Sequence, residues 1–149
     1  TELFFESTRR QLFVAQRDTG TLWSVDLEAQ QPSLSIVAEN LGWPISLGYG
    51  RQAQRLYVTD AKNRRIWALD CRRWCSDPTV FFESESLGNF TTLAVALDGA
   101  LWLGDLEEQT LRTITPEGTV GRTIYSFSGA SKPGVVLPDP EPVSGASPP

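Results

Sequence analysis

Two aspartates at matching positions of the sequence are its clearest candidates for chemistry. Asp60 ends the segment Leu56–Asp60, and Asp105 ends the similar segment Leu101–Asp105. Carboxylates that converge on one point can bind a divalent cation or transfer protons. The competing interpretation is that both side chains accept hydrogen bonds inside the fold, as buried polar groups usually do.

Other residue types that catalytic sites need are scarce. The 149 residues contain no histidine, so a Ser-His-Asp or Cys-His arrangement cannot form from this chain. No glycine-rich loop resembles a phosphate-binding loop. The two cysteines, Cys71 and Cys75, do not suit a four-ligand zinc site without histidine or a second cysteine pair. We therefore assign no catalytic residue, metal ligand or cofactor.

The two cysteines lie in a turn-rich segment and are either disulfide-bonded or reduced; we favour the disulfide. Closing so short a loop adds about 2 kcal/mol of stability if the Cα atoms approach within about 7 Å. Asn89-Phe90-Thr91 fits the N-glycosylation pattern, with Asn89 as acceptor. A disulfide and a glycan are typical of oxidising compartments, so we expect an extracellular or secreted protein.

Charge and hydropathy exclude two classes of partner. The formal net charge is −5, and no long basic run is present to neutralise phosphates, so nucleic acid is not an expected partner. No stretch approaches the roughly 20 apolar residues that span a bilayer, so we expect no membrane span.

The two aspartates belong to a unit that occurs three times. Leu12–Gln16 is the first copy of the segments that end at Asp60 and Asp105, and the copies follow at intervals of about 45 residues. Each unit holds four short apolar or alternating runs between turn residues, including Thr79–Glu83 in the second and Thr92–Leu97 in the third. The expected fold is all-β: a β-propeller of three four-stranded antiparallel blades.

Three blades are fewer than the four to eight of a typical closed propeller. We expect the blades at about residues 1–40, 41–86 and 87–127, followed by a tail or linker rich in proline, serine and glycine at 128–149. Two blade faces then lack a neighbour, and large exposed apolar faces mark interaction sites. We expect a protein partner, a second copy or the other half of the propeller to cover them.

Leu56–Ile66 resembles the central stretch of NHL repeats, and its first five residues are similar to the YWTD repeats of extracellular six-bladed propellers. Leu93–Trp102 is close to the NHL pattern of an inner strand, an Asp-Gly turn and the next strand. Gluconolactonase-like and strictosidine-synthase-like propellers share such repeats. The resemblance implies half of a six-bladed ring, in which Asp60 and Asp105 bond to groups of neighbouring blades and fix their register.

Loops at one end of the blades form the candidate binding surface, because connections in an antiparallel blade alternate ends. Arginine and aromatic side chains are frequent in binding hot spots. The alternative is that these are solvated turn charges around local packing, and a glycan on Asn89 would compete with binding. The candidate residues are Arg17, Trp43, Lys62, Arg64, Arg65 and Phe90.

These observations favour a non-catalytic extracellular module for protein binding or assembly. One alternative is half of a gluconolactonase-like or strictosidine-synthase-like enzyme. Such an enzyme needs oxygen ligands around a central divalent cation, and the expected inner strands here are apolar or small, so missing blades would hold most of the metal. A second alternative is a self-associating structural subunit.

Overall fold

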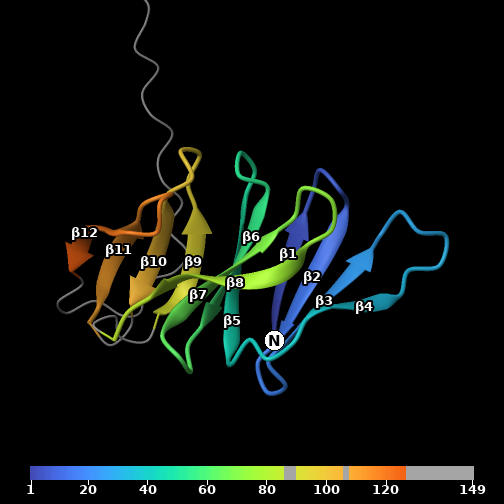
Figure 1. Cartoon of the computed structure of the whole chain (residues 1–149), viewed down its shortest axis with the longest axis horizontal. Coiled ribbons are helices and arrows are strands. Elements are labelled where there is room, and N and C mark those ends of the chain that lie inside the picture. Colours follow the sequence, from blue (N-terminus) through green and yellow to red (C-terminus); the bar gives the residue numbers. More distant parts are fainter. Residues whose placement is uncertain (86–89, 106–107, 127–149) are drawn as a thin grey trace, which may run out of the picture.

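The computed structural model describes residues 1–85, 90–105 and 108–126 (Figure 1). These residues form twelve β-strands in three separate four-stranded antiparallel sheets. The predicted all-β fold of three four-stranded blades is confirmed. No helix that could cross a membrane occurs in the described ranges.

Each sheet takes four strands that are consecutive in the chain. The first blade contains β1 (Glu2–Glu6), β2 (Gln11–Gln16), β3 (Thr21–Asp26) and β4 (Leu34–Ala38). The second contains β5 (Pro44–Gly50), β6 (Arg55–Asp60), β7 (Arg65–Asp70) and β8 (Ser76–Glu83). The third contains β9 (Phe90–Val95), β10 (Leu101–Asp105), β11 (Thr110–Ile114) and β12 (Val120–Ser126).

Two strands differ from their expected bounds by more than one residue at an end. β8 begins at Ser76 rather than Thr79, and β9 covers 90–95 rather than 92–97. β9 ends early because Ala96 and Gly99 form a turn, in which the Gly99 N–H donates to the Ala96 carbonyl at 3.0 Å. Leu97 consequently lies in that turn with 91% of its surface exposed.

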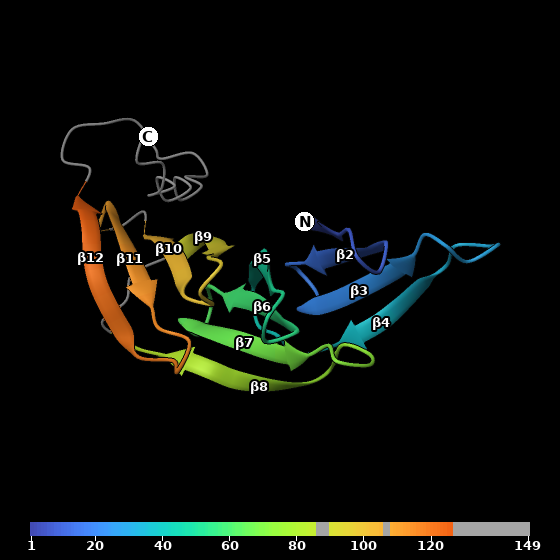
Figure 2. The ribbon, with the colours of Figure 1, turned by 90° about the horizontal axis from the view of Figure 1, so that it is seen from above.

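The blades form an open arc (Figure 2). The inner strand β5 contacts both other inner strands, β1 and β9, while β4, β8 and β12 lie along the convex outer side. Successive side chains of a strand point to opposite faces of its sheet. In β6 this alternation sends Leu56 and Val58 toward the first blade and Tyr57 toward the third, so the middle blade is buried on both faces.

Two hydrophobic cores hold the arc together, one at each junction between blades. Burial of apolar surface is the main stabilising contribution of such contacts. The core between the first and second blades includes Phe13, Ala15, Leu22, Leu41, Leu47, Leu56, Val58 and Leu69. The core between the second and third includes Tyr57, Ile66, Phe82, Phe90, Leu93, Leu101, Leu103 and Ile114.

Candidate functional site

A shallow polar hollow lies on the loop face between the first and second blades. It is formed where the β2–β3 turn, the β4–β5 connection and the β6–β7 turn meet, as the alternation of connections predicts. Trp43 is 43% exposed there, and the Arg17 guanidinium lies over its ring, 4.8 Å from the centroid. The hollow is lined by Asp18, Thr19, Gly20, Asn40, Gly42, Trp43, Lys62 and Asn63. Arg17, Trp43 and Lys62 are thus brought to one place.

The two other predicted arginines, Arg64 and Arg65, form contacts within the second blade. Arg64 is exposed, and its Nη1 donates to the Glu85 carbonyl at 2.9 Å. Arg65 pairs with Glu83 at 3.1 Å, and its guanidinium lies over the ring of Trp67. Both side chains therefore contact groups of the second blade, and neither lines the hollow.

Phe90 does not lie on the binding surface that we expected. It is the first residue of β9, and its side chain, 1% exposed, points into the core between the second and third blades. A strand begins where we expected a loop, and its first side chain faces inward. Asn89, the expected glycan acceptor, lies outside the described residues.

Asp60 is fully buried and accepts hydrogen bonds from three residues that line the hollow. Its Oδ1 accepts bonds from the backbone N–H groups of Trp43 (3.0 Å), Lys62 (3.0 Å) and Asn63 (3.2 Å). Its Oδ2 accepts a bond from Asn63 Nδ2 at 2.7 Å. These bonds tie the chain entering β5 to the β6–β7 turn, so they position Trp43 and Lys62 within the second blade rather than joining neighbouring blades.

Asp105 occupies the equivalent position in the third blade. Its side chain is 1% exposed, and Oδ1 accepts a bond from the Glu108 N–H at 3.0 Å. It therefore makes the same kind of contact with the turn that follows its strand.

Gly42 permits the close approach of the chain to Asp60. It has φ +71°, and a Cβ added to it would collide with the Asp60 carboxylate. We expect Gly42→Ala to lower the free energy of unfolding by about 2 kcal/mol, because the left-handed backbone and the collision act together. Urea denaturation measures this change.

Gly99→Ala is the matched control. Gly99 has φ +89°, but a Cβ there would meet only Pro116, at 3.6 Å. Its expected cost is that of the backbone alone, about 1 kcal/mol. An equal loss in the two variants would contradict the role of the Asp60 contact.

Two oxygen-bearing side chains of the inner strands, Glu6 and Ser46, are engaged in hydrogen bonds within the fold. Glu6 of β1 accepts bonds from the backbone N–H groups of Thr8 (3.0 Å) and Arg9 (2.7 Å). Burial acts to raise the pKa of Glu6, but these hydrogen bonds outweigh it and hold the pKa below its ordinary value. The Ser46 hydroxyl of β5 accepts a bond from the Leu93 N–H at 3.1 Å. These oxygens therefore accept hydrogen bonds that stabilise the fold.

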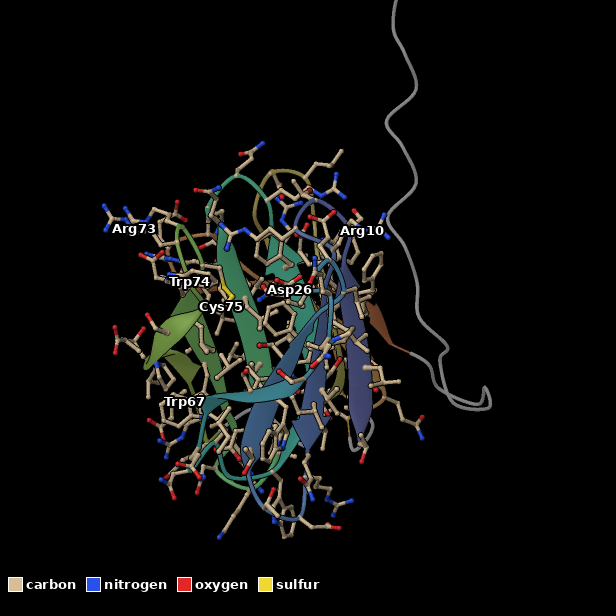
Figure 3. All side chains as sticks on the ribbon, turned by 90° about the vertical axis from the view of Figure 1, so that its right-hand side faces the viewer. Arg10, Asp26, Trp67, Arg73, Trp74 and Cys75 are labelled. Atoms are coloured by element: carbon tan, nitrogen blue, oxygen red, sulfur yellow. A yellow bond between two sulfur atoms is a disulfide. The ribbon has the colours of Figure 1, made fainter. Side chains whose placement is uncertain are left out.

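The end of the molecule opposite the loop face carries the cysteines. Cys71 and Cys75 form a disulfide with a Cα–Cα distance of 4.0 Å, which confirms the favoured pairing. Trp74, inside this loop, is 78% exposed. Figure 3 shows Arg73, Trp74 and Cys75 at the same end as Arg10.

Comparison with protein families identifies the type of propeller. The family model described as "SMP-30/Gluconolactonase/LRE-like region" matches residues 4–130, which include nearly all of the three blades. The chain belongs to this family. The propeller class expected from the repeats is therefore correct, whereas the narrower NHL or YWTD assignment is not shown. No curated protein matches the sequence significantly.

Solved structures share the fold of this family member. A gluconolactonase from Xanthomonas campestris matches with a TM-score of 0.71 and 16% identity, over 84% of this chain and 46% of that protein. A luciferin-regenerating enzyme matches with a TM-score of 0.68 and 17% identity, over 84% and 45%. Regucalcin from Agrobacterium tumefaciens, described as a calcium-binding protein, matches with a TM-score of 0.66 and 15% identity, over 81% and 43%. The chain thus spans a little less than half of each.

The family match corrects the expected function. We expected a non-catalytic extracellular module, but the matching family and two of these structures are named for enzymes. The repeats misled us because their apolar positions encode the packing of blades, which binding modules and enzymes share. The location of the protein stays a prediction.

Proposed function

We propose that this chain is a three-blade half of a gluconolactonase-like enzyme, which hydrolyses the cyclic ester of a lactone to a hydroxy acid. The observation that carries the proposal is the family match over residues 4–130. The coverage of the solved relatives supports the assignment to a half, since a complete ring would need about as many residues again.

The described residues do not form a divalent cation site by themselves. Regucalcin is described as a calcium-binding protein, and calcium takes six to eight oxygen ligands. Within the described part of the chain, no group of three or more His, Cys, Asp or Glu side chains could hold a metal ion. Glu6, Asp60 and Asp105 instead accept hydrogen bonds from turns. In the complete enzyme, the missing blades would therefore hold most of the ligands of any such cation.

The contribution proposed for this half is recognition of the substrate at the hollow. A sugar-derived lactone has apolar ring faces that pack on an aromatic side chain, and Trp43 presents such a surface beside β5. Hydrolysis converts the ester into a carboxylate, whose negative charge Arg17 and Lys62 attract. Asp60 holds the backbone of Trp43 and Lys62 in place.

The proposal is tested by lactone hydrolysis with the protein in its natural length and assembly. Proton release from glucono-δ-lactone and a panel of other lactones is followed in weak buffer, before and after EDTA treatment and then with added calcium or zinc. We expect hydrolysis above the spontaneous rate. A folded, assembled protein that hydrolyses no lactone under any of these metal conditions would refute the enzymatic assignment.

Replacing Trp43 by alanine tests the recognition role. We expect KM to rise about tenfold, equivalent to about 1.4 kcal/mol of binding, with a smaller change in kcat. Trp74→Ala is the matched control, because Trp74 is exposed at the opposite end. Equal KM values in the two variants would show that the hollow does not contact substrate.

A further inference from the structure

A pocket of about 210 Å³ lies between the second and third blades, at the end of the molecule opposite the loop face. The β5–β6 turn and the β9–β10 turn form its rim, and both stand at the top of Figure 1. The disulfide lies at the same end, because the Cys71 N–H donates to the Gln54 carbonyl of the β5–β6 turn at 2.8 Å. The pocket is therefore separate from the hollow around Trp43, and its walls come from two neighbouring blades of this chain.

The repeat explains why this space is open. Glu6 of β1 corresponds to Gly50 of β5 in the pairing of the inner strand with the next strand. Tyr49 of β5 corresponds in the same way to Val95 of β9. At the junction between the first and second blades, Glu6 is 3% exposed and Tyr49 packs against the core. At the next junction a glycine and a valine replace these large side chains, and the pocket occupies the space that they leave.

Tyr57 gives the pocket a polar group. The residue is 2% exposed and lines the pocket, and its Cε2 would lie 3.2 Å from a Cβ added to Gly50. The hydroxyl end of the ring therefore lies beside Gly50. No hydrogen bond joins this hydroxyl to any described residue. In the same part of the chain, Arg65 Nε is the only fully buried side-chain nitrogen or oxygen without a partner, so the Tyr57 oxygen is open to the pocket.

The lining favours an uncharged ligand with a single ring. Val95, Ala96 and Leu97 offer apolar contacts from the third blade. Arg51 is the charged residue of the lining, but its Nη2 donates to Ser7 Oγ at 3.1 Å, so its guanidinium is directed to the first blade. A buried tyrosine hydroxyl normally has a hydrogen-bond partner, which an oxygen of the ligand would supply. An apolar cavity of about 150 Å³ accommodates benzene, so the volume suits one six-membered ring.

We propose that this pocket binds an uncharged monocyclic compound that carries a hydroxyl or carbonyl oxygen. The ring packs against Val95 and over Gly50, and the oxygen accepts a hydrogen bond from the Tyr57 hydroxyl. Because the walls come from two blades, the bound compound stabilises the junction between them. The inference depends on this junction and not on lactone hydrolysis at the hollow, so its test measures binding alone.

Fluorine NMR with 4-fluorophenol gives the first test, with the protein in its natural length and assembly at neutral pH. We expect saturable binding with a dissociation constant of about 1 mM or lower. Cyclohexanol and cyclohexanone are expected to displace the probe, and each is expected to raise the thermal melting temperature. Absence of saturable binding by all three compounds would refute the proposal.

Tyr57→Phe tests the hydrogen bond. The variant removes only the hydroxyl, so we expect it to bind 4-fluorophenol about fivefold more weakly. Fluorobenzene lacks the oxygen, and its affinity is expected to be the same for both proteins. No hydrogen bond to a described residue is lost, and far-UV circular dichroism establishes that the variant is folded. Equal affinity of 4-fluorophenol for the two proteins would overturn the role of Tyr57.

Val95→Phe tests the position of the ligand. The larger side chain fills the pocket, as Tyr49 fills the preceding junction, so we expect binding to weaken at least about tenfold. Val80→Phe is the matched control, because Val80 is 45% exposed on the outer strand β8 and does not line the pocket. Trp43→Ala is also expected to bind normally. Equal affinity of the two phenylalanine variants, or loss of binding in Trp43→Ala, would place the ligand elsewhere and refute the site.

Gly50→Ala is a milder obstruction of the same pocket. Its Cβ would lie 3.2 Å from Tyr57 Cε2 and 3.6 Å from Val95 Cγ1. We expect it to weaken binding of 4-fluorophenol about threefold. Unchanged affinity in this variant, once folding is verified by circular dichroism, would likewise refute binding over Gly50, whether or not Val95→Phe folds.

Discussion

Replacing Asp60 by alanine is expected to lower the free energy of unfolding by about 4 kcal/mol. The carboxylate is fully buried and accepts four hydrogen bonds, three of them from backbone N–H groups. Alanine leaves those donors without their acceptor and removes the negative charge 3.8 Å from Arg65 Nε. Urea denaturation followed by tryptophan fluorescence measures the loss.

Asp18→Ala is the control for this experiment. Asp18 lines the same hollow but is exposed, so its replacement is expected to change the free energy of unfolding by no more than about 0.5 kcal/mol. Equal stability of the two variants would show that Asp60 does not hold the loops. Retained stability with lost activity would instead assign Asp60 to the chemistry.

The second large effect is expected from Leu56→Ala, which should cost about 3 kcal/mol. Leu56 is fully buried in the core between the first and second blades. Removing its branched side chain leaves a cavity at the junction, and β6 cannot collapse to fill it because Tyr57 faces the other core. Urea denaturation again gives the free energy of unfolding.

Leu97→Ala provides the comparison for the buried leucine. It removes the same atoms from a side chain that is 91% exposed, so the expected change is within about 0.5 kcal/mol. A similar loss in both variants would mean that the junction between the blades contributes little to stability.

The fold was largely predictable because the repeat places apolar residues and turns at equivalent positions in all three units. Leu12, Leu56 and Leu101 recur in register, and strands began and ended close to the expected residues. β9 was misplaced because Leu97 extends the apolar run of Leu93 and Val95 beyond the strand. Because a side chain in a turn can be apolar, hydropathy alone did not mark where β9 ends.

The site was predictable only in part. The alternation of connections correctly brought Arg17, Trp43 and Lys62 to one face, since that follows from topology. The inward direction of Phe90 did not follow from the sequence, because one residue of register decides which way a side chain points. The family was not apparent because Leu56–Asp60 encodes packing and a turn contact, which propellers of unrelated function share.

The consecutive order of strands within each sheet affects how neighbouring blades can separate. In the described residues, no strand of one sheet pairs with a strand of another. A junction between blades can therefore open without breaking any strand-to-strand ladder; opening breaks isolated hydrogen bonds such as that from Leu93 N–H to Ser46 Oγ and admits water to the core. Each four-stranded sheet then stays intact, so neighbouring blades are able to separate as rigid units before either of them unfolds.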